Sequence, residues 1–310
     1  MFVGRRHLAA VAGVAIVCVV IAATARAMHF TDWSTALKID TINGNSTELN
    51  TTSLDGCPIQ SPDGLSLYMA SNRPGGLGGL DIWVAHRASS AAPFGAPENL
   101  GEPVNSAADD FCPTPVRGKG LFLVSREALP GSCGQGDIYF TSRHPVRGWN
   151  EPQRLACAPA GPNTALDEQG PSFVDLGSRQ LLYFSTSSVT PAAAGDIFVS
   201  ARRKKAAFGP AIAVAGLNDA IANDIQPNIR KDGLEVVFSS NRAGGAGGQD
   251  IWSATRDKVG EPWSAPVNVG GVVNTGAAET RPSLSWDGDQ LLFGRSPGPE
   301  GMSDIYVSAR

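Results

Sequence analysis

The chain has 310 residues, of which 17% are charged, and it contains 36 Gly and 22 Pro. Frequent Gly and Pro with few charges are typical of many short strands joined by turns rather than of long helices. The formal net charge of −4 argues against nucleic acid as a partner. A single closed all-β domain of this length is common, so we expect one domain rather than two.

Residues 1–27 differ from the rest of the chain. Arg5 and Arg6 precede an uncharged apolar run from Leu8 to Ala23, and a small-x-small site, Ala25-Arg26-Ala27, follows. This order is typical of a secretory signal peptide, and the run is short for a membrane span. We expect a mature domain of residues 28–310, periplasmic or secreted, with 22 basic and 29 acidic residues and a net charge of −7. The alternative is an uncleaved anchor, which would be the only membrane contact of the chain.

The cysteines outside the signal are even in number: Cys57, Cys112, Cys133 and Cys157. In an exported chain this favours two disulfides over metal ligation. Cys57 and Cys112 occupy equivalent places in neighbouring repeats, so our first choice pairs them and leaves Cys133 to pair with Cys157. Cys112 with Cys133 is the second choice, if neighbouring repeats lie too far apart for a disulfide.

A repeat that contains Asp-Ile-aromatic occurs five times. Its aspartates are spaced 54 to 59 residues apart, at Asp81, Asp137, Asp196, Asp250 and Asp304. Each unit offers a proline-bearing segment, an apolar run after a turn, the Asp-Ile-aromatic run and, in most units, an aromatic-led outer segment, which together predict four strands. The units cover approximately residues 55–105, 110–160, 168–218, 224–274 and 279–310. The fifth unit lacks an outer strand, but residues 30–43 have the build of one, from Trp33 to Ile42-Asn43.

We therefore predict an all-β, five-bladed β-propeller of four-stranded antiparallel blades, with the ring closed by an N-terminal strand. Closure from the other end of the chain removes exposed sheet edges. The stretch from Ser61 to Trp83 reads S-P-D-G-x-x-L-Y-x-x-S-N-R-x-G-G-x-G-G-x-D-I-W. It resembles the WD40-like Pro-Asp propeller repeat of the TolB-type family, and this resemblance implies a protein of the bacterial envelope.

A carboxylate precedes the strand proline by three residues in every unit: Asp55, Asp110, Glu168, Asp224 and Glu279. The first strand of a propeller blade lines the central channel, so we expect these acids to form a ring near one mouth. Converging carboxylates repel one another and a cation relieves that cost, so the ring is a candidate site for calcium or a cationic ligand. The alternative, which the regularity favours, is that each acid caps the turn into its strand or pairs with an arginine of its own blade.

The residue just before each strand proline varies from unit to unit, which is typical of a functional position. Two of these residues are long and polar, Gln226 and Arg281, and we expect both to join the acids on the ligand-binding face.

Two arginines end second strands, Arg73 and Arg242, each eight residues before the repeat aspartate and separated from it by a glycine-rich loop. We expect each arginine to pair with that aspartate within its blade, Arg73 with Asp81 and Arg242 with Asp250. The remaining repeat aspartates are expected to hold the same structural network in their own blades.

Catalytic motifs are sparse in this chain: neither Gly-x-Ser-x-Gly nor His-Glu-x-x-His occurs. The prediction is therefore an exported, non-catalytic binding or scaffold propeller, without a cofactor, that recognises an envelope protein, peptide or glycan on the face with the carboxylates. The alternative is a glycoside hydrolase or lyase that uses two of the ring carboxylates at the channel mouth. A third hypothesis is a structural module stabilised by calcium.

Overall fold

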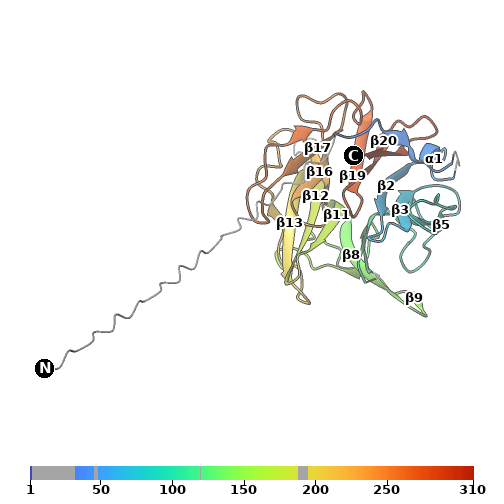
Figure 1. Ribbon diagram of the computed structural model, residues 1–310. Helices are drawn as coiled ribbons and strands as arrows, with labels where there is room; N and C mark the ends of the chain where they lie inside the picture. Colours follow the sequence, from blue (N-terminus) through green and yellow to red (C-terminus); the bar gives the residue numbers. More distant parts are fainter. Residues whose placement is uncertain (2–31, 45–47, 119, 188–194) are drawn as a thin grey trace. The chain divides into compact units, whose positions relative to one another are not determined.

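The computed structural model describes residue 1 and residues 32–44, 48–118, 120–187 and 195–310 (Figure 1). Asp32–Arg310 form one compact unit. The expected signal peptide lies outside the described residues, apart from Met1. No helix in the described part of the chain is long and apolar enough to cross a membrane.

The described residues form five antiparallel sheets, which we call blades 1 to 5. Blade 1 contains β2 (Asp55–Gln60), β3 (Ser66–Ser71), β4 (Asp81–His86) and β5 (Glu98–Asn99). Blade 2 contains β6 (Asp110–Val116), β7 (Gly120–Ser125), β8 (Asp137–His144), β9 (Gly148–Trp149) and β10 (Gln153–Arg154). Blade 3 contains β11 (Asp167–Asp175), β12 (Arg179–Ser187), β13 (Asp196–Arg203) and β14 (Ile212–Ala213).

Blade 4 contains β15 (Asp224–Ile229), β16 (Glu235–Ser240), β17 (Asp250–Thr255) and β18 (Val267–Asn268). Blade 5 combines β19 (Ala278–Leu284), β20 (Gln290–Ser296) and β21 (Asp304–Ala309) with β1 (Leu37–Lys38) from the other end of the chain. One short helix, α1 (Ile39–Ile42), follows β1.

The blades form a closed ring around their first strands. β2 contacts β6, β6 contacts β11, β11 contacts β15, β15 contacts β19, and β19 returns to β2. β1 supplies the outer strand of blade 5, with Leu37 opposite Val307 and Lys38 opposite Tyr306. The five-bladed propeller closed by an N-terminal strand is thus confirmed.

An asparagine side chain clamps the third strand of every blade. In blade 1 the side chain of Asn105 accepts the N–H of Ile82 at 2.8 Å and donates to its carbonyl at 3.0 Å. In blade 5 the equivalent clamp on Ile305 comes from Asn50, so the chain ends are joined here as well as through β1. Asn43, which ends the segment expected to form the outer strand of the fifth unit, instead binds the backbone of Phe94 in blade 1.

Every first strand contains a β-bulge at the residue before its proline. The ladder register shifts at this point in all five blades, because proline has no N–H to donate to the neighbouring strand. The residues at the bulge all have positive φ, between 48° and 56°: Cys57, Cys112, Gly170, Gln226 and Arg281. A left-handed backbone is unfavourable for four of them, which are not glycine. We call the end of the channel ringed by these five residues the channel mouth.

Two disulfides, Cys57–Cys112 and Cys133–Cys157, are present, in the pairing that the sequence analysis placed first. The first joins the bulges of blades 1 and 2, and the second lies within blade 2. Disulfides persist in oxidising compartments, so they indicate an extracellular or periplasmic protein.

Candidate functional site at the channel mouth

The five repeat acids lie beside the channel mouth but are covered. None of Asp55, Asp110, Glu168, Asp224 and Glu279 is more than 1% exposed. Each accepts a hydrogen bond from a backbone N–H at the start of its own turn, such as Thr51 to Asp55 at 2.6 Å and Thr164 to Glu168 at 3.0 Å. The acids therefore cap the turns into their strands and do not present a ring of free carboxylates to the channel.

Three of these acids are paired with an arginine of the same blade whose side chain is at most 15% exposed. Their partners are Arg73 for Asp55, Arg242 for Asp224 and Arg295 for Glu279. The Arg73 and Arg295 pairs have N–O distances of 2.6 and 2.7 Å. Each of these carboxyl groups is thus held in place by a cation of its own blade.

The sequence analysis expected Arg73 and Arg242 to pair with the repeat aspartates Asp81 and Asp250. The structure does not show these pairs. Asp81 is occupied by the backbone N–H groups of Leu77 and Gly78 in the glycine-rich loop and by the side chain of Asn99. Asp250 is held similarly, by the N–H of Ala246 and by Asn268. Arg73 and Arg242 turn instead toward the acids of the first strand, Asp55 and Asp224.

Asp137 and Asp304 also accept loop N–H groups, from Cys133 and Glu300 respectively. Asp196 stands at the start of β13, where burial and then the nearby Asp224 raise its pKa. The repeat aspartates thus belong to the loop ends of their blades rather than to the channel mouth.

Asp110 and Glu168, on neighbouring blades 2 and 3, have no arginine or lysine partner among the described residues. In blade 2 the place of Arg73 is taken by Glu127, two residues after the end-of-strand serine. The nearby Arg126 binds the residues that precede the two acids, Asp109 at 3.0 Å and Asp167 at 2.7 Å.

Burial therefore acts on Asp110 and Glu168 without compensation from a cation. It raises the pKa of Glu168 to about 8, against the hydrogen bonds from Thr164, and one carboxyl oxygen of Glu168 is buried without a partner. Burial also raises the pKa of Asp110, while hydrogen bonds from Ser125 and Ser106 lower it. Glu168 is thus protonated at neutral pH, the state that a general acid requires.

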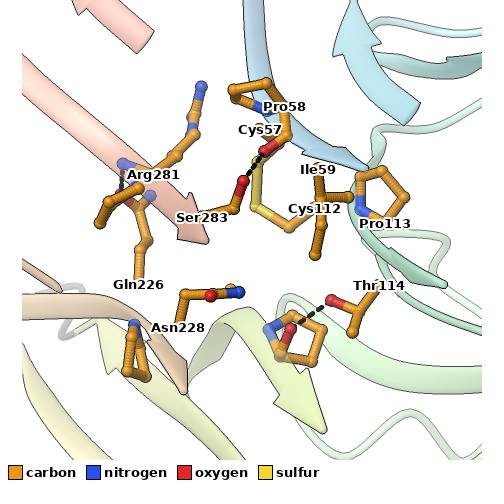
Figure 2. Close-up of a pocket in the computed structure, with 14 residues that line it drawn as sticks. Cys57, Pro58, Ile59, Cys112, Pro113, Thr114, Gln226, Asn228, Arg281 and Ser283 are labelled. Carbon is orange, nitrogen blue, oxygen red and sulfur yellow. Dashed lines mark hydrogen bonds between the residues drawn. A yellow bond between two sulfur atoms is a disulfide. The ribbon is translucent and has the colours of Figure 1, made fainter. Parts of the chain in front are cut away.

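The channel mouth encloses a cavity of about 30 Å³, lined by the bulge residues, their prolines and the residues that follow (Figure 2). The Cys57–Cys112 disulfide lies on one side, and Gln226 with Arg281 on another. Gly170 has no room for a side chain in this ring, because a Cβ there would lie 2.7 Å from the Cα of Gln226. The sequence analysis named Gln226 and Arg281 for this mouth, and their roles there remain predictions.

A larger groove of about 670 Å³ lies at the opposite ends of the strands, between blades 1 and 2. Its lining includes Tyr68 and Trp149 and the charged side chains Asp63, Arg117 and Arg143. Asp63 is the one carboxylate among the lining residues, and its hydrogen bonds from Ser61 and Leu65 lower its pKa. The groove therefore offers no pair of carboxyl groups for acid–base chemistry.

The described residues contain no set of side chains arranged to bind a metal ion. No group of three or more His, Cys, Asp or Glu side chains there could hold a metal ion. The side chains that would have formed a calcium ring are instead hydrogen-bonded within their own blades.

Three site residues, Arg126, Asp167 and Gln169, were not named from the sequence. The amide of Gln169 donates to Asp167 at 3.0 Å, and its oxygen lies 3.5 Å from Nε2 of Gln226 at the channel mouth. A signal was present, because acidic pairs, Asp109-Asp110 and Asp167-Glu168, occur only in the units that lack the arginine.

Comparison with known proteins finds the same fold in several solved structures. The chain is similar to the catalytic domain of a GH62 α-L-arabinofuranosidase from Coprinopsis cinerea, with 12% identity over 90% of this chain and 96% of that one and a TM-score of 0.55. It is also similar to a GH43 endo-arabinanase from Bacillus licheniformis, with 12% identity, 84% and 93% coverage and a TM-score of 0.52. A TolB-like propeller from Agrobacterium tumefaciens matches with 14% identity, 89% and 96% coverage and a TM-score of 0.50.

No family model matches the chain. No curated protein matches it either. The structural similarities therefore establish the fold, a five-bladed propeller.

The expectation of a non-catalytic binding or scaffold propeller, more likely not an enzyme, is corrected by these comparisons. Most of the similar structures are glycoside hydrolases of families 43 and 62. The earlier inference treated repeat-equivalent acids as scaffolding in all blades alike, whereas two of the five differ from the rest in charge compensation.

Proposed function

We propose that the protein is a glycoside hydrolase that acts beside the channel mouth, with Glu168 as general acid and Asp110 as the second carboxyl group. The observation that carries the proposal is that these two ring acids alone lack a cationic partner among the described residues, and that they lie on neighbouring blades. The fold shared with families 43 and 62 supports the same class of reaction.

The proposed roles follow from the protonation states. Hydrolysis of a glycosidic bond needs one protonated carboxyl group for the leaving oxygen and one carboxylate on the other side of the sugar. With its pKa raised to about 8, Glu168 holds a proton at neutral pH and would give it to the glycosidic oxygen as the bond to the anomeric carbon breaks. Asp110, which accepts hydrogen bonds from Ser106, would either take a proton from the attacking water or attack the anomeric carbon itself.

The two carboxyl groups are covered in this structure, so the mechanism requires that the loops above them open when a glycan binds. Arg126 bridges these loops through Asp109 and Asp167, and its side chain is 36% exposed. Its ion pairs are therefore partly solvated and weaker than the buried pairs of blades 1, 4 and 5. A polar substrate that competes for Arg126 would free the loops.

The glycans to test first contain arabinose, because several of the similar structures are arabinofuranosidases or arabinanases. The repeats resemble the TolB-type Pro-Asp repeat, and with the expected signal peptide this favours a periplasmic enzyme over a fully secreted one.

The test is turnover of arabinan, arabinoxylan and a panel of other glycans, measured as released reducing sugar. Glu168→Gln and Asp110→Asn should each lower kcat by at least about 100-fold, the contribution of a positioned acid or base. The matched control is Asp224→Asn, the equivalent acid of blade 4, which should keep kcat when assayed well below its melting temperature. Turnover that survives in Glu168→Gln, or equal losses at all three positions, would contradict the assignment.

A further inference from the structure

Arg281 occupies the bulge of β19 in blade 5 and has no counterion among the described residues. Its backbone N–H donates to the side chains of Gln226 and Ser239, at 3.1 and 3.2 Å. Its guanidinium, in contrast, makes no hydrogen bond or ion pair with any residue that the structure describes, and its Nε atom is buried. The arginines paired with the repeat acids of blades 1, 4 and 5 all differ from it in this respect.

The position of this guanidinium is set by the blades around it. It lies against Gly56 in blade 1, where an added Cβ would be 2.7 Å from its Nη1. Burial, followed by the nearby positive charge of Arg126, lowers the pKa of Arg281 to about 10, which is still high enough for a full charge at neutral pH. Two arginines thus approach one another at the channel mouth, and only Arg126 is balanced by acids.

An unpaired, half-buried guanidinium is costly for the folded protein unless an anion binds to it. Its planar donors match a carboxylate, which can accept two parallel hydrogen bonds from one arginine. The amide of Gln226 lies in the same ring of the channel mouth: its oxygen accepts the backbone N–H of Arg281 at 3.1 Å, and its Nε2, only 3.5 Å from the side-chain oxygen of Gln169, can also donate to a hydroxyl group of a ligand. This combination of one cation and one amide suits a sugar that carries a carboxylate.

We propose that Arg281 binds the carboxylate of an acidic sugar at the channel mouth. The assignment to a sugar rests on the proposed hydrolase function and would make the substrate an acidic glycan, one that contains uronate units. Asp110 and Glu168 lie on the same side of the propeller, so a glycan anchored by its carboxylate at Arg281 would extend toward them.

The test is a thermal melt of the full chain with glucuronate or galacturonate as the probe. A ligand that binds only the folded state raises the melting temperature. Glucose, galactose, acetate and chloride at the same concentration and ionic strength are the controls. We expect a clear rise with a uronate, a smaller one with acetate, and none with the neutral sugars or chloride.

Variants then assign the effect to Arg281. Arg281→Gln should weaken uronate binding about 10- to 100-fold, the loss typical of a hydrogen bond to a charged group. Arg281→Lys keeps the charge but not the two parallel donors, so its affinity should be intermediate. Arg143→Gln, an exposed arginine in the groove at the opposite ends of the strands, is the matched control and should bind as the wild type does.

Several results would overturn the proposal: no shift with either uronate, a shift of equal size with a neutral sugar, acetate or chloride, or unchanged binding in Arg281→Gln. Its failure is distinguishable from failure of the hydrolase function. Glu168→Gln should still bind uronate while it loses turnover. If the protein binds uronate but hydrolyses no glycan, only the catalytic proposal is contradicted. If it hydrolyses a neutral glycan and Arg281→Gln does so equally well, only the proposed anion site is contradicted.

Discussion

The Nη2 atom of Arg73 lies 2.6 Å from Oδ1 of Asp55, with side chains that are 9% and 0% exposed. The Arg242–Asp224 pair in blade 4 repeats this arrangement, with exposures of 11% and 0%. Blades 2 and 3 keep the acid without the arginine. The same repeat position is therefore a fixed anion in some blades and an uncompensated carboxyl group in others.

Loss of the arginine should be far more damaging than loss of the whole pair. Arg73→Met leaves the carboxylate of Asp55 buried without a counterion, and we expect it to lower the free energy of unfolding by about 3–5 kcal/mol. The double variant Asp55→Asn with Arg73→Met removes both charges and should recover part of that loss. Urea unfolding at pH 7 measures both.

Lys258 and Glu261 provide the control for that experiment, since their side chains are 79% and 46% exposed and 3.7 Å apart. Lys258→Ala should change the free energy of unfolding by less than about 0.5 kcal/mol. An Arg73→Met variant as stable as Lys258→Ala would contradict the buried ion pair.

The stability of the protein should fall with rising pH because of Glu168. Its pKa is about 8 in the folded state and about 4.5 ordinarily, so between these values the unfolded chain releases a proton that the folded protein keeps. The stabilising contribution of the protonated group is complete below pH 4.5 and is lost progressively up to pH 8, on the order of 5 kcal/mol in total.

Glu168→Gln should remove this slope, because its amide does not titrate. Unfolding free energies measured at pH 5, 6, 7 and 8 should show the variant gaining on the wild type as pH rises. Glu279→Gln, which breaks the ion pair with Arg295, is the matched control and should lower stability without removing the slope. Parallel pH curves for the wild type and Glu168→Gln would refute the raised pKa.

The sequence predicted the fold well because the repeat carries it. The spacing of Asp81 and its four equivalents defines five units, and the displaced segment that contains Leu37 reveals closure of the ring. Sequence spacing brought Arg73 near Asp81, but it could not show that backbone N–H groups already occupy Asp81. The direction of the Arg281 side chain could not be predicted from the sequence either, because it depends on Gly56, which is 225 positions earlier in the chain.

The two disulfides should contribute nearly equally to stability, with the first slightly ahead. Cys57–Cys112 spans 55 residues of sequence and Cys133–Cys157 spans 24. The chain-entropy relation gives about 4 and about 3.5 kcal/mol for loops of these lengths. Paired Cys→Ser variants, compared by urea unfolding without reductant, test the order; a larger loss for the Cys133–Cys157 pair would show that loop entropy does not dominate.

Asn50 should control the opening of the ring. Its side chain, which is fully buried, accepts the N–H of Ile305 at 2.7 Å and donates to the same residue's carbonyl at 3.2 Å, across 255 positions of sequence. Asn50→Ala leaves both backbone groups without that partner, and we expect a loss of about 2–4 kcal/mol in the free energy of unfolding.

Asn105→Ala is the matched control, because Asn105 makes the same pair of hydrogen bonds to Ile82, only 23 positions away. The loss in the free energy of unfolding should be similar for Asn105→Ala, because the same kinds of backbone group, one N–H and one carbonyl, lose their partner. Only Asn50→Ala weakens a contact that joins the two ends of the chain, so only this variant should speed hydrogen exchange at the amides of β21 and β1 under native conditions. Equal exchange in the two variants would show that strand pairing of β1 with β21 closes the ring without help from the clamp.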